Sequence, residues 1–452
     1  MANQYSPYVT VTPCVLRAQE APQKVAIRAR EAYAQKLLDA VVRVRVVSVD
    51  GPTIKWRKWR SFGEWLRDTP PTEFHRTEDG GLTVAVTTPV EGEYTLRLDV
   101  ADDAGGPVEK AVFFVYALAD DLYELTPYKG DFHMHSTASD GVHSPEYVAA
   151  TCRRTGFDFM ALTDHRLYDP SLVARQAMAE FGCDMLVTPG EEVHLPDNGV
   201  HIINFGGKAS INRLAADDEP AYFAAVGEYM KSVPGKYDEV TRFQVAASEW
   251  AFDRIRECGG VAMFCHPYWR PRSHTYIGED AIGLLLERRR FDVLEAIGGF
   301  EPFEFEGNML SVARWREETA KGRTIPVAGV SDSHDCDTSL TGWYYTIVFA
   351  KELSFDAIAA AIRSDRGVAV HSPPGNFPLV VGPFRLVRFA YFLLREVYPA
   401  HDELCRVEGE IMRRSLAGEE LDARGELARR RGEVEAYLAR CMGRAERTSR
   451  LP

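Results

Sequence analysis

The sequence lacks several features that define special classes of protein. Its eight cysteines form no C-x-x-C pair, and its first residues lack the charged and apolar regions of a secretory signal peptide. A run of about 18 apolar residues, which a membrane-spanning helix requires, is also missing. Together these absences favour a reduced, cytoplasmic setting with free thiols and no membrane contact.

A surplus of basic charge is missing as well. The chain has 53 Lys and Arg against 66 Asp and Glu, which gives a formal net charge of −13. Proteins that bind nucleic acid usually present a basic surface or stripe to the phosphates. We therefore expect no nucleic-acid partner. A small anionic or ester substrate remains compatible with this charge, because bound metal ions would make a site locally positive. The oligomeric state stays open.

The length of 452 residues exceeds one typical core, so two or three domains are expected. Residues 1–125 contain six short β-prone segments separated by turn signals such as Asp50-Gly51-Pro52. These segments are 9–12, 24–30, 41–47, 82–87, 94–100 and 111–117. The pattern predicts an all-β sandwich of immunoglobulin type, which we interpret as a packing or interaction module. The basic stretch Lys55–Arg60 reads as an exposed strand, with a nucleic-acid patch as the alternative.

The character of the sequence changes after residue 125. From 126 to 375, short apolar strand candidates alternate with helical patterns, which predicts an α/β domain with a parallel sheet. The strand candidates are 130–135, 157–163, 185–189, 201–205, 260–265, 293–297 and 327–330. About seven strands fit a closed or nearly closed (β/α)7 barrel, with an inserted helical segment near 212–245. Residues 376–452 read as a helical extension, a hairpin with a break near Leu416–Gly418.

Nine of the twelve histidines fall between residues 133 and 334. His133 and His135 are one residue apart on a predicted strand, where residues i and i+2 point to the same side. Both imidazoles could then reach one cation at about 2.0–2.1 Å, the usual Zn–N distance. Taken alone, the pair is weak evidence for a metal site, because two histidines on a strand face are often surface residues.

Further histidines and acids recur where strand candidates meet the following loop. In β/α barrels the carboxyl ends of the strands carry the active site. Beyond His133 and His135, the candidates are Asp140, His165, Glu191 or Glu192, His201, His266, Asp332 and His334. Nitrogen and carboxylate oxygen ligands suit Zn, Mn or Fe in hydrolytic sites. Nine such ligands can fill about three sites and leave positions for water.

The order His-x-His, Ser-Asp-Gly, Thr-Asp-His, Gly-x-Glu, His, Cys-His-Pro and Ser-Asp-x-His resembles the polymerase and histidinol phosphatase (PHP) superfamily. The resemblance covers about residues 128–372. It implies a distorted (β/α)7 PHP barrel with a trinuclear centre of two to three divalent ions. The N-terminal β-sandwich before this barrel is also similar, in architecture alone, to PHP metallohydrolases of the carbaryl-hydrolase type.

The resemblance also implies which residues hold each metal ion. One ion would be held by His133, His135, Glu192 and Asp332. A second would be held by Glu192, His201 and His266, and a third by Asp140, His165 and His334. Glu192 is preferred to Glu191 because the family pattern has one residue between the Gly and the Glu. Asp332, Glu192 and His334 are expected to act in catalysis.

Two metals close together would lower the pKa of a bridging water, and the resulting hydroxide would attack phosphorus or a carbonyl carbon. Arg166 and Arg270 are candidate contacts for the substrate anion, with surface or ion-paired arginines as the alternative. His143, His194 and His274 lie in the same loops and match no motif position. They are either loop histidines or contacts to the ligands or the substrate.

The leading hypothesis is a metal-dependent phosphoesterase that acts on a small phosphorylated molecule. The alternative within enzymes is a metal-dependent carboxyl ester, carbamate or amide hydrolase. A proofreading exonuclease is less favoured because the chain is acidic and shows no polymerase region. A non-catalytic binding module would be expected to have lost some of the ligands, and none is missing here.

Overall fold

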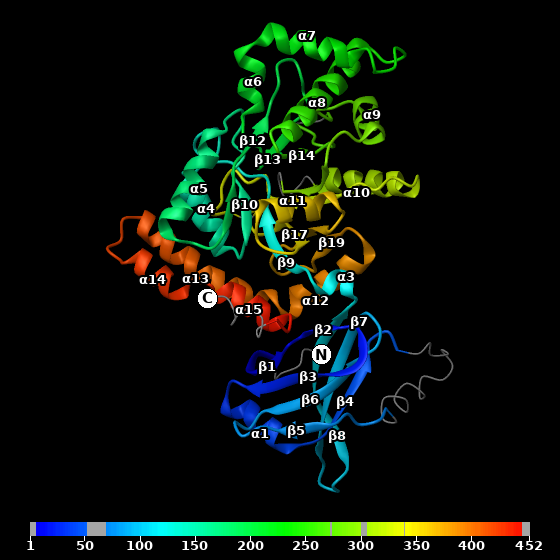
Figure 1. Ribbon diagram of the computed structural model, residues 1–452, viewed down its shortest axis with the longest axis vertical. Helices are drawn as coiled ribbons and strands as arrows, with labels where there is room; N and C mark the ends of the chain where they lie inside the picture. Colours follow the sequence, from blue (N-terminus) through cyan, green and yellow to red (C-terminus); the bar gives the residue numbers. More distant parts are fainter. Residues whose placement is uncertain (1–5, 52–68, 272–273, 300–304, 339, 445–452) are drawn as a thin grey trace. The chain divides into compact units, whose positions relative to one another are not determined.

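The computed structural model describes residues 6–51, 69–271, 274–299, 305–338 and 340–444 (Figure 1). The chain divides into two compact units. One contains the described residues up to Thr126, Tyr391–Pro399 and the segment from Glu433 onward; the other contains Pro127–Ala390 and Ala400–Gly432. The predicted division at residues 125 and 375 stays a prediction. The basic stretch Lys55–Arg60 lies outside the described residues.

The first unit contains two four-stranded sheets, ordered β1-β3-β6-β5 and β2-β8-β7-β4. The strands are β1 (Val9–Thr12), β2 (Val15–Arg17), β3 (Gln19–Ala29), β4 (Val41–Ser48), β5 (Phe74–Arg76), β6 (Leu82–Thr88), β7 (Gly92–Ala101) and β8 (Pro107–Leu118). Alternate residues such as Val84 and Val86 are buried, and side chains of both sheets share one apolar core. The immunoglobulin type of this arrangement stays a prediction.

Among the described residues before Thr126, two helices interrupt the expected all-β pattern, α1 (Ala32–Ala40) and the short α3 (Asp120–Tyr123). Helix α1 buries Ala34, Leu37 and Leu38, which recur at the three- and four-residue spacing of one helix face. The sequence reading missed α1 because its nine residues lie between two strongly β-prone segments.

The second unit is α/β, as predicted, and contains two larger sheets. One has the order β11-β10-β9-β17-β18-β19 and the other the order β12-β13-β14-β15-β16. The first sheet comprises β9 (Thr126–Asp131), β10 (Phe159–Ala161), β11 (Leu186–Thr188), β17 (Tyr344–Ala350), β18 (Gly367–His371) and β19 (Leu379–Val381). The second comprises β12 (Gly190–Val193), β13 (Ile202–Phe205), β14 (Val261–Phe264), β15 (Val293–Gly298) and β16 (Val327–Val330). Phe159, Phe205 and Val330 belong to one buried core that draws on both sheets.

Strand directions depart from the regular parallel order that the sequence predicts. Strands β9, β10 and β11 are parallel, as are β14, β15 and β16. Strand β13 is antiparallel to both β12 and β14. A short loop without a helix joins β12 to β13, and such a connection suits an antiparallel pair. Strand β18 is also antiparallel to its neighbours. A complete (β/α)7 barrel therefore stays a prediction.

Helices lie between most of these strands. They are α4 (Pro145–Arg154), α5 (Asp169–Phe181), α6 (Ile211–Asp217), α7 (Glu219–Met230), α8 (Glu239–Glu257), α9 (Glu279–Arg288), α10 (Phe305–Ala320) and α11 (Phe355–Arg363). Helix α4 begins as the sequence predicts, with the Ser144 side chain accepting from the Tyr147 amide and Pro145 at the first position. Helices α6 to α9 share an apolar core with β12, β13 and β14.

The described part of the C-terminal segment, up to residue 444, contains four helices where the sequence predicted a hairpin. They are α12 (Phe384–Glu396), α13 (Tyr398–Leu416), α14 (Ala423–Arg430) and α15 (Glu433–Cys441). The predicted break after Leu416 is present, and Gly418 there adopts a positive φ of 87°. Gly432, with φ of 76°, adds a break between α14 and α15. Among the described residues, no helix combines the length and apolar character that a membrane span requires.

Two isolated bridges connect the strand ends of the two sheets in the second unit. Met134, just after β9, pairs with Ser333, just after β16, and His165 pairs with Glu192 on β12. The carboxyl ends of β9, β10 and β16 are thereby brought next to β12. The candidate ligands at or shortly after these strand ends are His133, His135, His165, Glu192, Asp332 and His334.

Candidate metal centre

The carboxyl ends of β9 and β16 are held together by a buried carboxylate. Asp131 accepts hydrogen bonds from the backbone amides of His133 (3.1 Å) and Ser331 (3.0 Å). Burial raises the pKa of Asp131 to about 7. Beyond this clamp, His133 and His135 point inward and are 0% and 1% exposed. The two histidines therefore face the interior and are not surface residues.

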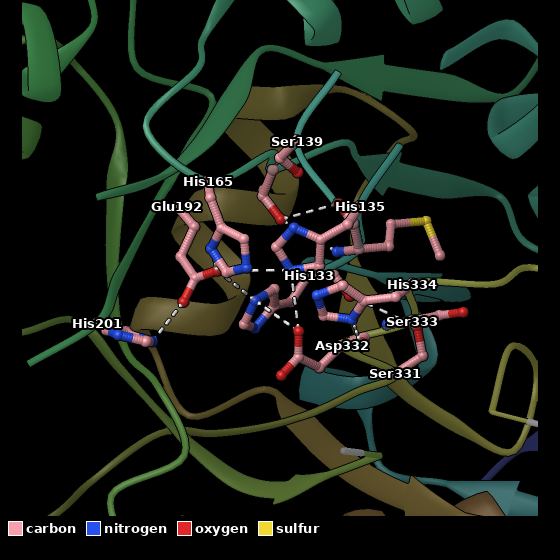
Figure 2. A network of polar contacts seen from close by, with 12 residues as sticks. His133, His135, Ser139, His165, Glu192, His201, Ser331, Asp332, Ser333 and His334 are labelled. Atoms are coloured by element: carbon pink, nitrogen blue, oxygen red, sulfur yellow. Dashed lines mark hydrogen bonds and ion pairs between the residues drawn. The ribbon is translucent and has the colours of Figure 1, made fainter. Parts of the chain in front are cut away.

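One oxygen of the Glu192 carboxylate is surrounded by three imidazoles. Its Oε2 atom lies 2.7 Å from Nδ1 of His165, 3.3 Å from Nε2 of His133 and 3.4 Å from Nε2 of His135. Figure 2 shows Glu192 beside His165, with its carboxylate directed toward the histidine cluster. These side chains come from three different strand ends.

The other oxygen of Glu192 faces a second group of three imidazoles. Its Oε1 atom lies 2.9 Å from Nδ1 of His201, 3.3 Å from Nε2 of His194 and 3.5 Å from Nε2 of His266. One of the dashed lines in Figure 2 joins the Glu192 carboxylate to the His201 ring. The carboxylate thus stands between two groups of nitrogen atoms, the position of a ligand that bridges two cations.

Asp332 completes the first group from the opposite side. Its Oδ1 atom lies 2.9 Å from Nε2 of His135 and 3.1 Å from Nε2 of His133. Asp332 has a positive φ of 47°, a backbone conformation that costs energy in a residue other than glycine. Its amide donates to the carbonyl of His133 at 3.0 Å, which helps to hold this conformation.

A third group lies on the solvent side of His135. Asp140 is exposed, with Oδ1 3.3 Å from Nε2 of His334 and Oδ2 3.4 Å from Nε2 of His165. The rings of His334 and His165 stack on the ring of His135, and their centroids lie 4.2 and 4.3 Å from the His135 centroid, respectively. One possible ligand atom from each residue lies within 4.8 Å of those of the other three in the group His135, Asp140, His165 and His334. The same is true of the group His133, His135, Glu192 and Asp332.

The loop that carries Asp140 is folded tightly by two residues of the sequence motifs. Asp164 accepts from the hydroxyl groups of Ser136 and Ser139, both at 2.7 Å. A Cβ at Gly141 would lie 2.8 Å from the carbonyl of His135, so only glycine permits this approach. Asp164 and Gly141 therefore position the loop and its carboxylate.

The donor atoms of the first group fit a cation. Nε2 of His133 and both oxygens of Glu192 are buried and make no hydrogen bond of normal geometry among the described residues. Buried polar atoms left in this state cost about 1–3 kcal/mol each. Imidazole nitrogen and carboxylate oxygen are the ligands that Zn²⁺ and related ions take. These residues therefore suit a bound divalent metal better than a hydrogen-bonded core.

The hydrogen-bond partners of two histidines fix which ring nitrogen faces the cluster. Nδ1 of His334 lies 3.0 Å from the carbonyl oxygen of Asp332, which can only accept, so Nδ1 carries the proton. Nδ1 of His133 lies 3.2 Å from a carboxylate oxygen of Glu295 and donates to it for the same reason. Nε2 is therefore the nitrogen of each ring that faces the acids of the site.

Burial and charge act in opposite directions on the groups of the cluster. Burial alone would raise the pKa of Glu192, but its electrostatic contacts with the surrounding imidazoles, His133 first, outweigh this effect and hold that pKa well below its usual range. The pKa of Asp332 is lowered in the same way, chiefly by His133 and His135. Burial lowers the pKa of His201 to about 4. Both carboxylates are thus ionised, the form that binds a cation.

Glu191, the alternative to Glu192, has a different environment. Its carboxylate accepts from the Ser210 hydroxyl at 2.7 Å and from the Asn212 amide group at 2.9 Å, at the start of α6. It therefore anchors this helix and does not face the histidines.

The two arginines expected to bind an anion differ in their surroundings. Arg166 is exposed and has a positive φ of 62°, and its backbone amide donates to the carbonyl of Glu192 at 2.9 Å. The Arg270 side chain forms an ion pair with Glu306 at 2.8 Å. The substrate roles of both stay predictions.

Sequence reasoning missed Glu295 and left the role of His194 open between a loop histidine and a contact to the ligands or the substrate. Glu295 is the one acid in the apolar strand candidate 293–297, and an acid in a buried strand is a signal that it has a partner. His194 follows Glu192 by two residues, the spacing that places two side chains on the same side of a strand. His143 pairs with Asp335 at 3.1 Å, outside the Glu192 cluster.

Comparisons with known proteins give one match in sequence. No protein-family model matches the chain. A segment of 53 residues is 47% identical to DNA polymerase/3'-5' exonuclease PolX of Bacillus subtilis, covering 12% of this chain and 9% of that protein. The chain thus spans less than a tenth of this relative. The shared segment supports the resemblance to the PHP superfamily.

Solved structures give more distant likenesses. A two-domain protein from Bacteroides vulgatus containing a predicted PHP-like metal-dependent phosphoesterase is 20% identical, with a TM-score of 0.42, over 60% of this chain and 71% of that one. An Endonuclease Q complex with a 27-mer duplex carrying an abasic lesion is 15% identical, with a TM-score of 0.33, over 53% and 57%. These low TM-scores add no further argument.

The expectation that the chain has no nucleic-acid partner is wrong. The relative that shares the 47% identical segment is a DNA polymerase and 3'-5' exonuclease. Net charge is a poor guide here because it averages over the whole chain, whereas an anion responds to the local charge of the site.

Proposed function

We propose that this chain is a metal-dependent hydrolase of the PHP type that cleaves phosphoesters. The observation that carries the proposal is the Glu192 carboxylate, whose two oxygens each face three imidazole nitrogens at 2.7–3.5 Å. Bridging carboxylates with histidine ligands are typical of hydrolytic centres that hold two or more metal ions. A closed, distorted (β/α)7 barrel around this centre is part of the proposal.

Three groups of side chains would hold the metal ions, Zn, Mn or Fe. One is His133, His135, Glu192 and Asp332; the second is Glu192, His201 and His266; the third is Asp140, His165 and His334. Bound divalent ions polarise phosphoryl oxygens and lower the pKa of a coordinated water. The first group is buried and the third is open to solvent, so the substrate would approach from the side of Asp140 and His334.

The residues of the chain would share the remaining work of the reaction. Asp332 and Glu192 are ionised and buried, and they balance the positive charge that the site gathers. His334 lies at the solvent side with Asp140, where it would help to hold the ion that the substrate meets first. Arg166, exposed beside Glu192, would contact the substrate anion.

The type of phosphoester is open between a small phosphorylated molecule and a nucleic acid, because the PolX segment adds DNA to the possible substrates. A panel of p-nitrophenyl phosphate, bis-p-nitrophenyl phosphate, labelled single-stranded DNA and p-nitrophenyl acetate, each with Mn²⁺ or Zn²⁺, tests the proposal. We expect turnover of at least one phosphoester that a chelator abolishes. Turnover of the carboxyl ester alone would favour the ester, carbamate or amide hydrolase and overturn the proposal.

A further inference from the structure

The second group of imidazoles contains one more histidine than the sequence motifs assign. His201 and His266 match motif positions, whereas His194 matches none. Yet Nε2 of His194 lies 3.3 Å from Glu192 Oε1, between the distances of the other two histidines. The position of His194 therefore requires its own explanation.

The backbone directs the His194 side chain into the site. His194 comes directly after β12, two residues beyond Glu192, so both side chains leave the same side of the chain. Asn212 holds this segment from α6: its side-chain oxygen accepts from the His194 amide at 2.9 Å, and its amide group donates to the Glu192 carbonyl at 3.1 Å. The same side chain thus fixes His194 and the bridging carboxylate relative to each other.

Nε2 of His194 lies at the distance from Glu192 that a shared ion would set. The ring packs on the ring of His201, with centroids 3.9 Å apart and an angle of 28° between the planes. Its side chain is 16% exposed. Ligand atoms bound at about 2.0–2.1 Å to one tetrahedral ion lie about 3.3 Å apart. The distances of 2.9, 3.3 and 3.5 Å from Glu192 Oε1 to the three imidazoles cluster around this value.

We propose that His194 is a further ligand of the cation that Glu192, His201 and His266 would hold. This inference rests on the proposed metal-dependent function. Three imidazoles and one carboxylate form a nitrogen-rich set that suits Zn²⁺, whereas Mn²⁺ prefers oxygen ligands. The position is therefore a zinc-type site within the centre. A competing role is a hydrogen bond to His165, whose Nδ1 lies 2.9 Å from His194 Nε2.

Metal binding by the full-length chain tests the inference without relying on activity. The metal-depleted protein is titrated with Co²⁺ and Zn²⁺, and the metal content and visible Co²⁺ absorption are measured for wild type, His194→Ala and His194→Asp. His75→Ala is the matched control, because His75 is exposed on β5. Circular dichroism and thermal unfolding establish that each variant is folded, and His194→Gln replaces the Ala variant if that one is not.

We expect His194→Ala to bind one Co²⁺ ion at least about 100-fold more weakly, beyond the 10–100-fold typical of residues that only orient a ligand. The visible absorption of tetrahedral Co²⁺ should decrease in His194→Ala together with the affinity. It should recover in part in His194→Asp, because the carboxylate supplies an oxygen ligand in place of the imidazole. Unchanged stoichiometry, affinity and absorption in His194→Ala would overturn the inference. A His165→Ala variant is measured beside it, and a His194→Ala spectrum that matches the His165→Ala spectrum would also overturn the inference, because it would show that His194 acts through His165.

The same titration separates this inference from the proposed function. Wild-type protein that binds no metal would overturn both. Wild-type protein that binds metal but cleaves no phosphoester would overturn the phosphoesterase proposal alone, and the His194 result would still be read from the metal data.

Discussion

Glu295 Oε2 lies 3.2 Å from Nδ1 of His133, and both side chains are buried. A carboxylate in this position fixes the tautomer and orientation of the imidazole and makes its other nitrogen a stronger ligand. The pair links the apolar strand β15 to the first group of candidate metal ligands. Gly298 leaves room for this carboxylate, since a Cβ there would lie 2.2 Å from Glu295 Oε1.

Replacing Glu295 should therefore weaken metal binding without removing a ligand. We expect Glu295→Gln to lower the affinity for one cation about 10-fold and Glu295→Ala about 100-fold, because glutamine retains the acceptor oxygen and alanine does not. Isothermal titration with Zn²⁺ measures this order. Glu287→Gln on the exposed face of α9 serves as the control. Equal affinities in all four proteins would show that Glu295 does not position His133.

The adjacent acids Glu191 and Glu192 should respond differently to the same substitution. Glu192→Gln should reduce phosphoester turnover at least about 100-fold and lower the metal content, because the amide can no longer bridge two ions. Glu191→Gln should reduce the free energy of unfolding by about 1–3 kcal/mol, because it disturbs the hydrogen bonds at the start of α6. Kinetics, metal analysis and denaturant unfolding of both variants test this. A larger loss of metal in Glu191→Gln would reverse the assignment.

The two arginines should contribute unequally to substrate affinity. Arg166→Gln should raise KM for an anionic phosphoester about tenfold with little change in kcat, a loss of roughly 1.4 kcal/mol of binding. Arg270→Gln should have a smaller effect, because Glu306 already neutralises its guanidinium group. Steady-state kinetics at low and high salt provide the comparison, since an exposed charge loses its effect as salt rises. A KM unchanged in Arg166→Gln would remove this residue from the site.

A buried histidine outside the site predicts how stability depends on pH. On α13, Nε2 of His401 lies 2.9 Å from Oδ1 of Asp158, and its Nδ1 lies 3.0 Å from Oδ1 of Asp402. Arg153 also lies beside Asp158, at 3.8 Å. Burial alone would lower the pKa of His401, but the charge of Asp158 outweighs it and raises this pKa well above 6.5. The pKa of Asp158 is lowered, because the charge of His401 outweighs the effect of burial.

The sign of the effect follows from these two directions. A raised His401 pKa contributes stability that is complete below pH 6.5 and is lost as the pH rises through the folded-state pKa. The lowered Asp158 pKa contributes stability above pH 3.8 that is lost as the pH falls through its folded value. His401→Asn should cost about 3–5 kcal/mol at pH 6 and flatten the decline at alkaline pH. Denaturant unfolding across pH, with exposed His75→Asn as the control, tests this; parallel curves for His401→Asn and wild type would contradict it.

Several elements were predictable from the sequence because local chemistry determines them. The Ser144-Pro145 start of α4 and the break after Leu416 depend on residues close in the chain. Strand ends of the second unit were found because apolar runs stop where a histidine or acid begins. The α/β class followed from the alternation of these runs with helical patterns.

Other features depend on distant residues and could not be read from spacing. The antiparallel direction of β13 depends on a loop without a helix, and the strand β17 was missed although all seven of its residues are buried. Glu295 gains its meaning only from His133, which is 162 positions away. The expectation of no nucleic-acid partner failed because net charge says little about a local site.

Removal of His133 and His135, the first pair of candidate metal ligands, tests most directly the claim that this chain is a metal-dependent hydrolase. The metal content and phosphoester turnover of His133→Ala/His135→Ala are measured beside wild type after loading with Zn²⁺ or Mn²⁺. The account predicts that the double variant loses one metal ion per chain and all measurable turnover. Metal content and turnover equal to those of wild type would contradict it.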